Sequence, residues 1–181
     1  MRARRMSPRE PTTFEIRPAT AADVPEVARL LGDLGYQIDA AVLDERFLGF
    51  HAAGEVALVA ARRPGGAEAA PSLLGLATLH RTPVLHRAGP VGRVTSLVVD
   101  ERARGQGIGR ALMHEAERWA TERGCVLLEV TSNRRRTEAH AFYERLGYEA
   151  TSFRFARALA GDAANGRSSH ETAHDSRTGT R

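Results

Sequence analysis

The sequence predicts an α/β domain with a mixed central sheet, antiparallel in its N-terminal part and flanked by about four helices. Three observations support this fold class. Strand-like and helix-like patterns of apolar residues alternate along positions 14–158. A turn rich in proline and glycine joins two neighbouring strand patterns, which indicates a hairpin. Further along, an amphipathic helix separates two strand patterns, which indicates a crossover.

The N-terminal third predicts one strand and two helices. Phe14–Arg17 has the pattern of a short strand. Thr20 is a helix cap with an acidic partner, Asp23, three residues later. The helix behind them ends at Gly35 and carries apolar residues at helical spacing: Val24, Val27, Leu30, Leu31 and Leu34. Ala40–Phe50 predicts a second, weaker helix.

The middle of the chain predicts three strands. Glu55–Ala61 and Ser72–His80 are strand patterns separated by Pro64, Gly65 and Gly66, and therefore predict a hairpin. A loop over 81–92 follows, and Arg93–Val99 predicts the next long strand.

The C-terminal third predicts helix, strand, helix and strand. Positions 107–123 form an amphipathic pattern, and Cys125–Thr131 predicts a buried strand. Thr137 is expected to cap a helix that Gly147 ends, and Ser152–Ala156 to form the last strand. The resulting order is strand, two helices, three strands, helix, strand, helix, strand.

Charge and composition exclude several classes of protein. The two ends, 1–13 and 159–181, are polar and predicted to be disordered, with most of the excess positive charge at the N-terminal end. The domain between them has 19 arginines and 18 acids, which disfavours a nucleic-acid binder. No apolar run reaches the roughly 18 residues of a membrane span, and no secretory signal follows the first basic residues. We therefore expect a cytoplasmic protein without a membrane partner.

The absence of certain residue types excludes further chemistry. Cys125 is the only cysteine, so an internal disulfide and a cysteine-based zinc site are excluded. The sequence has no lysine, which excludes Schiff-base catalysis and a lysine-containing phosphate loop. His170 and His174 have helical spacing, but in so polar a stretch we interpret them as solvated and expect no metal site.

A glycine-rich turn between a strand and a helix is the most informative segment. Glycines at alternate positions allow consecutive amide groups to face one anion, and the helix N-terminus adds partial positive charge. Two flanking arginines can neutralise more phosphate charge. The segment predicts a pyrophosphate site at Arg104, Gly105, Gln106, Gly107, Ile108, Gly109 and Arg110.

Two rival phosphate sites fit the residues less well. The dinucleotide fingerprint, counted from Gly105, requires a small residue where Arg110 stands. Glu129 lies about as far downstream as that fingerprint's ribose-binding acid, but inside a predicted strand. An ordinary turn would not require three alternate glycines.

Two motifs together resemble the GNAT superfamily of N-acetyltransferases. Val99 to Gly109 is similar to the family's V-x-x-x-x-R/Q-G-x-G-x-G/A signature for acetyl-CoA, and Ala139 to Tyr148 resembles its second signature. The resemblance covers roughly residues 14–158. It implies a GNAT fold with six to seven strands that splay at the fourth and fifth, with acetyl-CoA as cosubstrate.

The resemblance also implies roles for individual residues. Leu97, Val98 and Val99 would offer backbone groups to the pantetheine arm and the thioester, and the amides of residues 106–110 would hold the pyrophosphate. Tyr143 matches the position whose hydroxyl protonates the departing thiolate, and Asn133 matches a contact to the cofactor arm. We interpret Arg134–Arg136 as solvated.

No residue is assigned as the general base. Many relatives have a glutamate on the strand equivalent to 93–99, where this sequence has none. His80, His86, His140 or a chain of water molecules could serve instead. We interpret Cys125 as an inert core thiol.

The resemblance leaves the acceptor open. The first hypothesis is that the acceptor is a primary amine of a small molecule. The alternatives are a protein N-terminus or lysine as acceptor, or a protein that binds acetyl-CoA as a sensor without catalysis. Aminoalkylphosphonate acetyltransferases are the most similar subgroup, although Arg93 replaces their acidic strand residue. Residues 32–50 and 81–92 would flank the acetyl end of the site, where Tyr36, Asp39 and Asp44 could attract a cation. Homodimers are common in the family.

Overall fold

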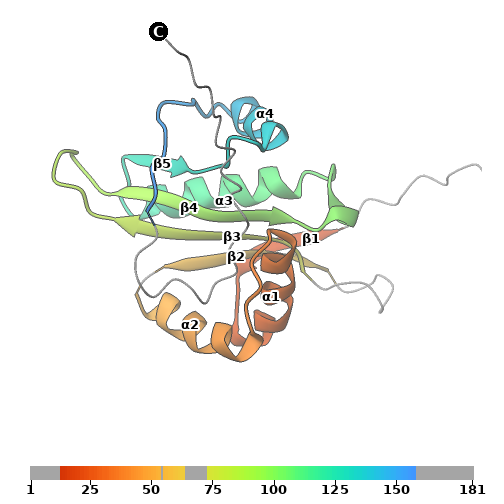
Figure 1. The fold of residues 1–181 in the computed structure, drawn as a ribbon. Coiled ribbons are helices and arrows are strands. Elements are labelled where there is room, and N and C mark those ends of the chain that lie inside the picture. The colour runs from red at the N-terminus through yellow and green to blue at the C-terminus, as the bar shows by residue number, and fades with distance from the viewer. Residues whose placement is uncertain (1–12, 54, 64–72, 158–181) are drawn as a thin grey trace, which may run out of the picture.

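The computed structural model describes residues 13–53, 55–63 and 73–157. The predicted tails 1–13 and 159–181 lie outside these ranges except for Thr13, and so do His170, His174 and the predicted hairpin turn. Five strands form one mixed sheet in the order β1-β2-β3-β4-β5 (Figure 1). Among the described helices, none is both long and apolar enough to cross a bilayer.

The order of elements along the chain agrees with the prediction up to the last helix. The strands are β1 (Phe14–Pro18), β2 (Val56–Arg62), β3 (Leu73–Thr82), β4 (Val91–Val99) and β5 (Leu127–Val130). The α-helices are α1 (Val24–Asp33), α2 (Ala40–Ala52), α3 (Ile108–Glu122) and α4 (Thr137–Arg145), and the short 3₁₀ turns are η1 (Ala21–Asp23) and η2 (Glu101–Ala103).

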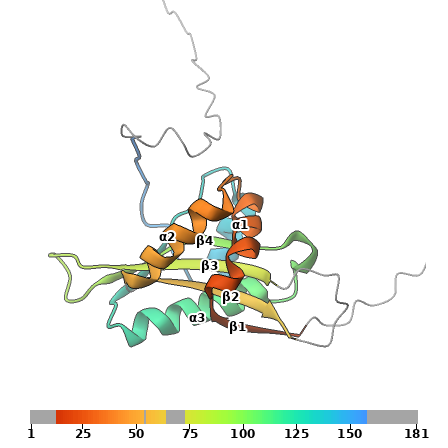
Figure 2. The same cartoon turned by 90° about the horizontal axis from the view of Figure 1, so that it is seen from below.

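Helices cover both faces of the sheet. Figure 2 shows α1 and α2 on one face and α3 on the other. The apolar residues of α1 and α2 pack with one set of sheet side chains, including Val59, Leu76 and Val98. Those of α3 pack with the opposite set, including Leu58, Leu79 and Val94. The middle of the sheet is therefore buried on both sides, which explains the almost unbroken apolar runs of β2 and β3.

β4 is the strand where the sheet opens. It pairs with β3 in antiparallel fashion along its length, with a register irregularity at Thr95. It pairs with β5 in parallel fashion only over Val91–Val94. Residues 95–99 therefore have no strand partner on the side away from β3 within the described residues. We call this side the open edge of β4, and it confirms the predicted splay between the fourth and fifth strands.

Three local predictions for the C-terminal part were wrong. Ser152–Ala156 forms no strand, so five strands are described instead of six to seven. Phe153 and Phe155 are exposed instead of packed. Because no described strand covers its outer edge, β5 is not buried, and Val126 and Leu127 are 52% and 38% exposed. Thr137 is the first helical residue of α4, and Arg136 stands at the cap position without a capping side chain.

The predicted cap lies at η1, the 3₁₀ turn that leads directly into α1. Asp23 accepts hydrogen bonds from the Thr20 amide at 2.8 Å and its hydroxyl at 3.0 Å. Arg17 of β1 donates two more, at 2.7 and 2.9 Å. These bonds to the Asp23 carboxylate, led by those from Arg17, lower its pKa to about 2.

This lowered pKa predicts acid-sensitive stability. Because the folded-state pKa lies below the unfolded value of 3.8, the contribution is complete above pH 4 and disappears as the pH falls towards 2. We expect Asp23→Asn to reduce the free energy of unfolding at pH 7 by about 1–2 kcal/mol, discounted because Arg17 is partly exposed. Urea unfolding at pH 7 and pH 2.5 measures this. A difference from wild type that stays constant between the two pH values would contradict it.

Candidate active site at the open edge of β4

The glycine turn, residues 104–110, presents a row of unpaired amide donors. Gly105 and Gly107 have φ angles of +80° and +82°, a conformation that favours glycine. The first amide of α3 with a hydrogen bond is that of Ala111, which donates to the Gly107 carbonyl at 3.0 Å. Within the described part of the chain, none of the six amides of residues 105–110 donates a hydrogen bond. Such a row at a helix N-terminus is a ready site for an anion.

Gly109 serves a different purpose from the other two glycines. A β-carbon at Gly109 would lie 3.3 Å from the ring of Phe142 on α4. At Gly105 and Gly107, a β-carbon would meet no protein atom within 4 Å. Gly109 therefore allows α4 to approach the first turn of α3, whereas Gly105 and Gly107 shape the turn.

The two arginines of the turn are both exposed, but they differ in contacts. Arg104 Nε lies 3.4 Å from the Val99 carbonyl oxygen, at the carboxyl end of β4. For Arg110 the structure shows no hydrogen bond or ion pair within the described residues, so its guanidinium extends freely from the first turn of α3. Both side chains belong to residues at the two ends of the glycine turn.

Peptide groups of β4 alternate between β3 and the open edge. Asp100 donates its amide to the Leu74 carbonyl of β3 at 2.9 Å. Since hydrogen-bonded pairs alternate along an antiparallel ladder, the peptide groups of Val98 also face β3. Those of Leu97 and Val99 face the open edge, as the contact of the Val99 carbonyl with Arg104 illustrates. An extended molecule at this edge could therefore bond to Leu97 and Val99.

Tyr143 lies on α4 with its ring packed and its hydroxyl unpaired. Its ring centroid is 5.2 Å from that of Phe142 and 6.1 Å from that of Tyr148. Within the described residues no hydrogen bond involves the Tyr143 hydroxyl, whereas Tyr148 donates to Glu117 at 3.0 Å. Burial raises the pKa of Tyr143, although the charge of Arg136 partly opposes it. The phenol therefore keeps its proton at neutral pH and can donate it.

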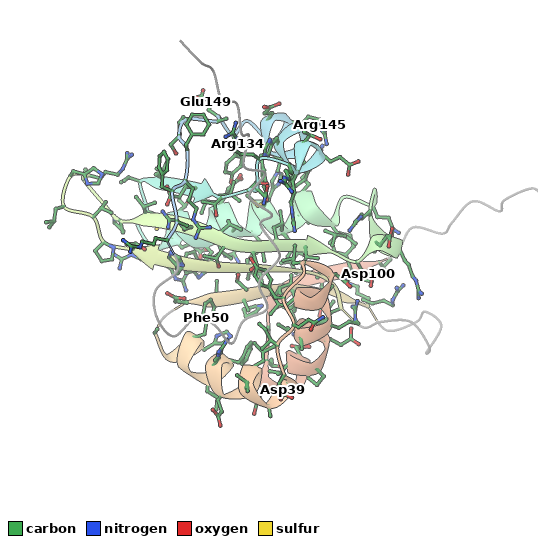
Figure 3. All side chains as sticks on the ribbon, viewed as in Figure 1. Asp39, Phe50, Asp100, Arg134, Arg145 and Glu149 are labelled. Carbon is green, nitrogen blue, oxygen red and sulfur yellow. The ribbon has the colours of Figure 1, made fainter. Side chains whose placement is uncertain are left out.

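Asn133 belongs to a turn that holds the N-terminus of α4. Its side-chain oxygen accepts a hydrogen bond from the Arg135 amide at 2.9 Å, and its carbonyl oxygen lies 3.0 Å from His140 Nε2. Arg136 reaches the Leu34 carbonyl at 3.3 Å, while Arg134 lies 5.5 Å from the Phe153 ring and is labelled in Figure 3. The arginine run is exposed, but two of its members have protein partners.

The other residues that the sequence analysis considered lie on several different elements and do not form one cluster. Arg93 forms an ion pair with Glu129, its register partner on β5. His80 is the register partner of Arg93 on β3, and His86 lies exposed in the β3–β4 loop. Cys125 is half-buried before β5 and packs against the core. Asp39 caps α2 by accepting the Ala41 amide at 2.8 Å, and Figure 3 shows it at the far end of that helix from Phe50.

The segment that forms most of these elements matches a known protein family. A profile of the acetyltransferase (GNAT) family matches residues 29–148, well over half of the chain. This chain belongs to the GNAT family. The predictions of a GNAT fold and of an acetyltransferase family are therefore confirmed.

Individual GNAT proteins resemble this chain to different extents in sequence and in fold. An aminoalkylphosphonate N-acetyltransferase of Salmonella typhimurium is 41% identical over 87 residues, which span 48% of this chain and 56% of that relative. An acetyltransferase structure from Trypanosoma brucei has a TM-score of 0.69 and 26% identity, covering 81% of this chain and all of that one. An aminoglycoside N-acetyltransferase in complex with CoA has a TM-score of 0.69 at 17% identity, covering 86% and 99%. The last likeness shows the GNAT fold alone.

One buried pair next to the turn was not found by sequence reasoning. Asp100 is 7% exposed and bonds to Arg29 of α1, 71 positions away. Figure 3 labels Asp100 between the carboxyl end of β4 and α1. No local pattern could indicate the partner, because the contact exists only after α1 packs on the sheet.

Proposed function

We propose that this chain transfers an acetyl group from acetyl-coenzyme A to a primary amine of a small molecule, by direct attack in a ternary complex. The proposal rests on the six amides of residues 105–110, which follow the open edge of β4 in the chain. None of them donates a hydrogen bond to another residue that the structure describes. Membership of the GNAT family supports the reaction type.

The residues present fit coenzyme A. The diphosphate would bind the amides of Gly105, Gln106, Gly107, Ile108, Gly109 and Arg110, with Arg104 and the Arg110 side chain neutralising its charge. The pantetheine arm would lie along the open edge and bond to Leu97 and Val99, while Val98 contributes its side chain to the core beneath. Asn133 retains its side-chain NH₂ group for the arm, because only its oxygen is used in the turn.

Two kinds of group on this chain support acyl transfer. When bound, acetyl-coenzyme A supplies an acetyl group activated as a thioester. Peptide N–H groups at Leu97 or Val99 can stabilise negative charge that develops on a carbonyl oxygen at the open edge. Tyr143 holds a proton on an unpaired hydroxyl and can donate it to a leaving thiolate.

The acceptor is proposed to be an amine carrying a phosphonate. The 41% identity with the Salmonella aminoalkylphosphonate N-acetyltransferase supports this class, although that match covers little more than half of the relative. The bond from Arg136 to the Leu34 carbonyl places the segment after α1 beside the N-terminus of α4. Acceptor contacts are therefore expected from residues 34–39 and from α4.

A panel of amines tests the proposal. Aminoalkylphosphonates, aminoglycosides, an N-terminal peptide and a lysine peptide are each incubated with acetyl-coenzyme A, and free thiol is measured. We expect turnover with aminoalkylphosphonates at least tenfold, that is about 1.4 kcal/mol, above the peptides. Turnover with the peptides alone would assign a protein acceptor. Binding of coenzyme A, with no thiol released from acetyl-coenzyme A in the presence of any of these amines, would indicate a sensor.

A further inference from the structure

An ion pair between the partly exposed Arg29 and the buried Asp100 joins α1 to the strand end from which the glycine turn begins. Arg29 donates from Nη1 to Asp100 Oδ2 at 2.8 Å and from Nη2 to the Leu73 carbonyl at 2.9 Å. Glu26, on the same face of α1, accepts from Arg29 Nη2 at 3.0 Å. One guanidinium therefore ties α1 to the first residue of β3 and to the residue that follows β4.

Asp100 uses all its polar atoms to fix the start of the turn. Its amide donates to the Leu74 carbonyl at 2.9 Å, and its carbonyl accepts from the Ala103 amide at 2.9 Å. Its Oδ1 accepts from the Arg102 amide at 2.9 Å, which leaves Oδ2 for Arg29. Because η2 leads directly into Arg104, the position of the Asp100 carboxylate determines where the glycine turn begins.

We infer that Arg29 is a positioning residue for the coenzyme A site, acting through Asp100, and this inference rests on the proposed function. Without Arg29, a carboxylate that is 7% exposed loses its charged partner, and such a group must turn towards water or change its contacts. Either response removes the cap from η2 and shifts the unpaired amides behind it. α1, which leads into the expected acceptor segment, is thereby coupled to the cofactor turn.

The chain offers a matched control in Arg17. Arg17 bonds to Asp23 at 2.7 Å, and Asp23 is 8% exposed and is the last residue of the 3₁₀ turn η1. The Arg17 side chain is 34% exposed, and that of Arg29 is 33% exposed. Both pairs join a one-third exposed arginine to a buried aspartate, although Arg29 also contacts Glu26 and Asp33. Only the Arg29 pair adjoins the glycine turn.

The test compares coenzyme A binding by calorimetry in Arg29→Gln and Arg17→Gln. Both variants should lose thermal stability. Only Arg29→Gln should raise the Kd for coenzyme A, on the order of tenfold, as when a supporting residue is removed from a binding site. Arg29→Lys keeps the positive charge but loses the several N–H donors of the guanidinium, so it should give an intermediate Kd. It replaces Arg29→Gln in the test if that variant does not fold.

A double variant adds a readout that a purely structural role would not move. Arg29→Gln/Asp100→Asn no longer contains the buried Asp100 carboxylate that Arg29 neutralised. The increase in its Kd for coenzyme A should therefore be smaller than the product of the increases in the two single variants. Equal Kd values in Arg29→Gln and Arg17→Gln, with tight binding by the wild type, would overturn the inference about Arg29 and leave the proposed function unaffected. Failure of the wild type to bind coenzyme A would overturn the proposed function and the inference with it.

Discussion

Tyr143→Phe is expected to reduce kcat about 100-fold while the Kd for coenzyme A stays within twofold of wild type. The substitution removes one hydroxyl that has no hydrogen-bond partner among the described residues, so no internal bond is broken. The ring keeps its contacts with Phe142 and Tyr148. What is lost is a proton donor, and positioned proton donors contribute roughly 10²–10⁴-fold to rate.

Tyr148→Phe is the control for this substitution. It removes a neighbouring phenol hydroxyl that donates to Glu117, so it should lower the melting temperature and leave kcat within about threefold. Rates are measured by thiol release with the best acceptor and binding by calorimetry. Equal kcat values in the two variants would exclude Tyr143 as the acid.

The pH profile gives a second test of Tyr143. Burial raises its pKa above the usual value of 10, and the protonated form is the one that can donate. Activity that depends on this proton should therefore persist through neutral and mildly alkaline pH and fall only above about pH 10. A fall in kcat centred below pH 9 that disappears in Tyr143→Phe would contradict the effect of burial.

Gly107→Ala is expected to weaken coenzyme A binding by tenfold or more. Gly107 has a φ of +82°, a conformation that costs an L-residue about 1–2 kcal/mol. The added methyl group would meet no protein atom within 4 Å, so the effect should come from the backbone and from the space that the ligand needs. Relief of the strain would turn the amides of the glycine turn away from a common point.

Gly124→Ala separates lost affinity from lost stability. Gly124 has a φ of +69° just past the opposite end of α3, so it carries a similar strain without adjoining the glycine turn. Both variants should unfold at a lower temperature in thermal melts, and only Gly107→Ala should lose affinity by calorimetry. Unchanged binding in Gly107→Ala would remove the glycine turn from the proposed site.

The first half of the fold could be predicted closely because its signals are local. Thr20 and Asp23 are three residues apart and form the predicted cap, and Gly35 follows α1 with the positive φ that such an end requires. The glycine turn was found for the same reason, since its conformation depends on residues that are consecutive in the chain. Gly109 was predicted as part of the glycine turn, but its closeness to Phe142 could not be predicted from the sequence.

The C-terminal predictions failed where a strand needs a partner. Phe153 and Phe155 belong to a segment in which apolar and polar residues alternate, as in a strand. A strand also needs a neighbouring strand edge with which to form hydrogen bonds, and no described strand pairs with this segment. Both phenylalanines are exposed. β5 was predicted to be buried because its residues are mostly apolar. The burial of a strand also depends on the elements that pack against it, and all four residues of β5 are at least partly exposed.

The sequence by itself determined the family, the order of most elements and the glycine turn, because each of these depends on residue types at short spacing. Only the tertiary structure decided which peptide groups of β4 face the open edge, that Arg93 pairs with Glu129, and that Arg29 holds Asp100. These contacts join residues 36 and 71 positions apart. They form when helices and strands pack, and short-range patterns carry no information about partners at that distance.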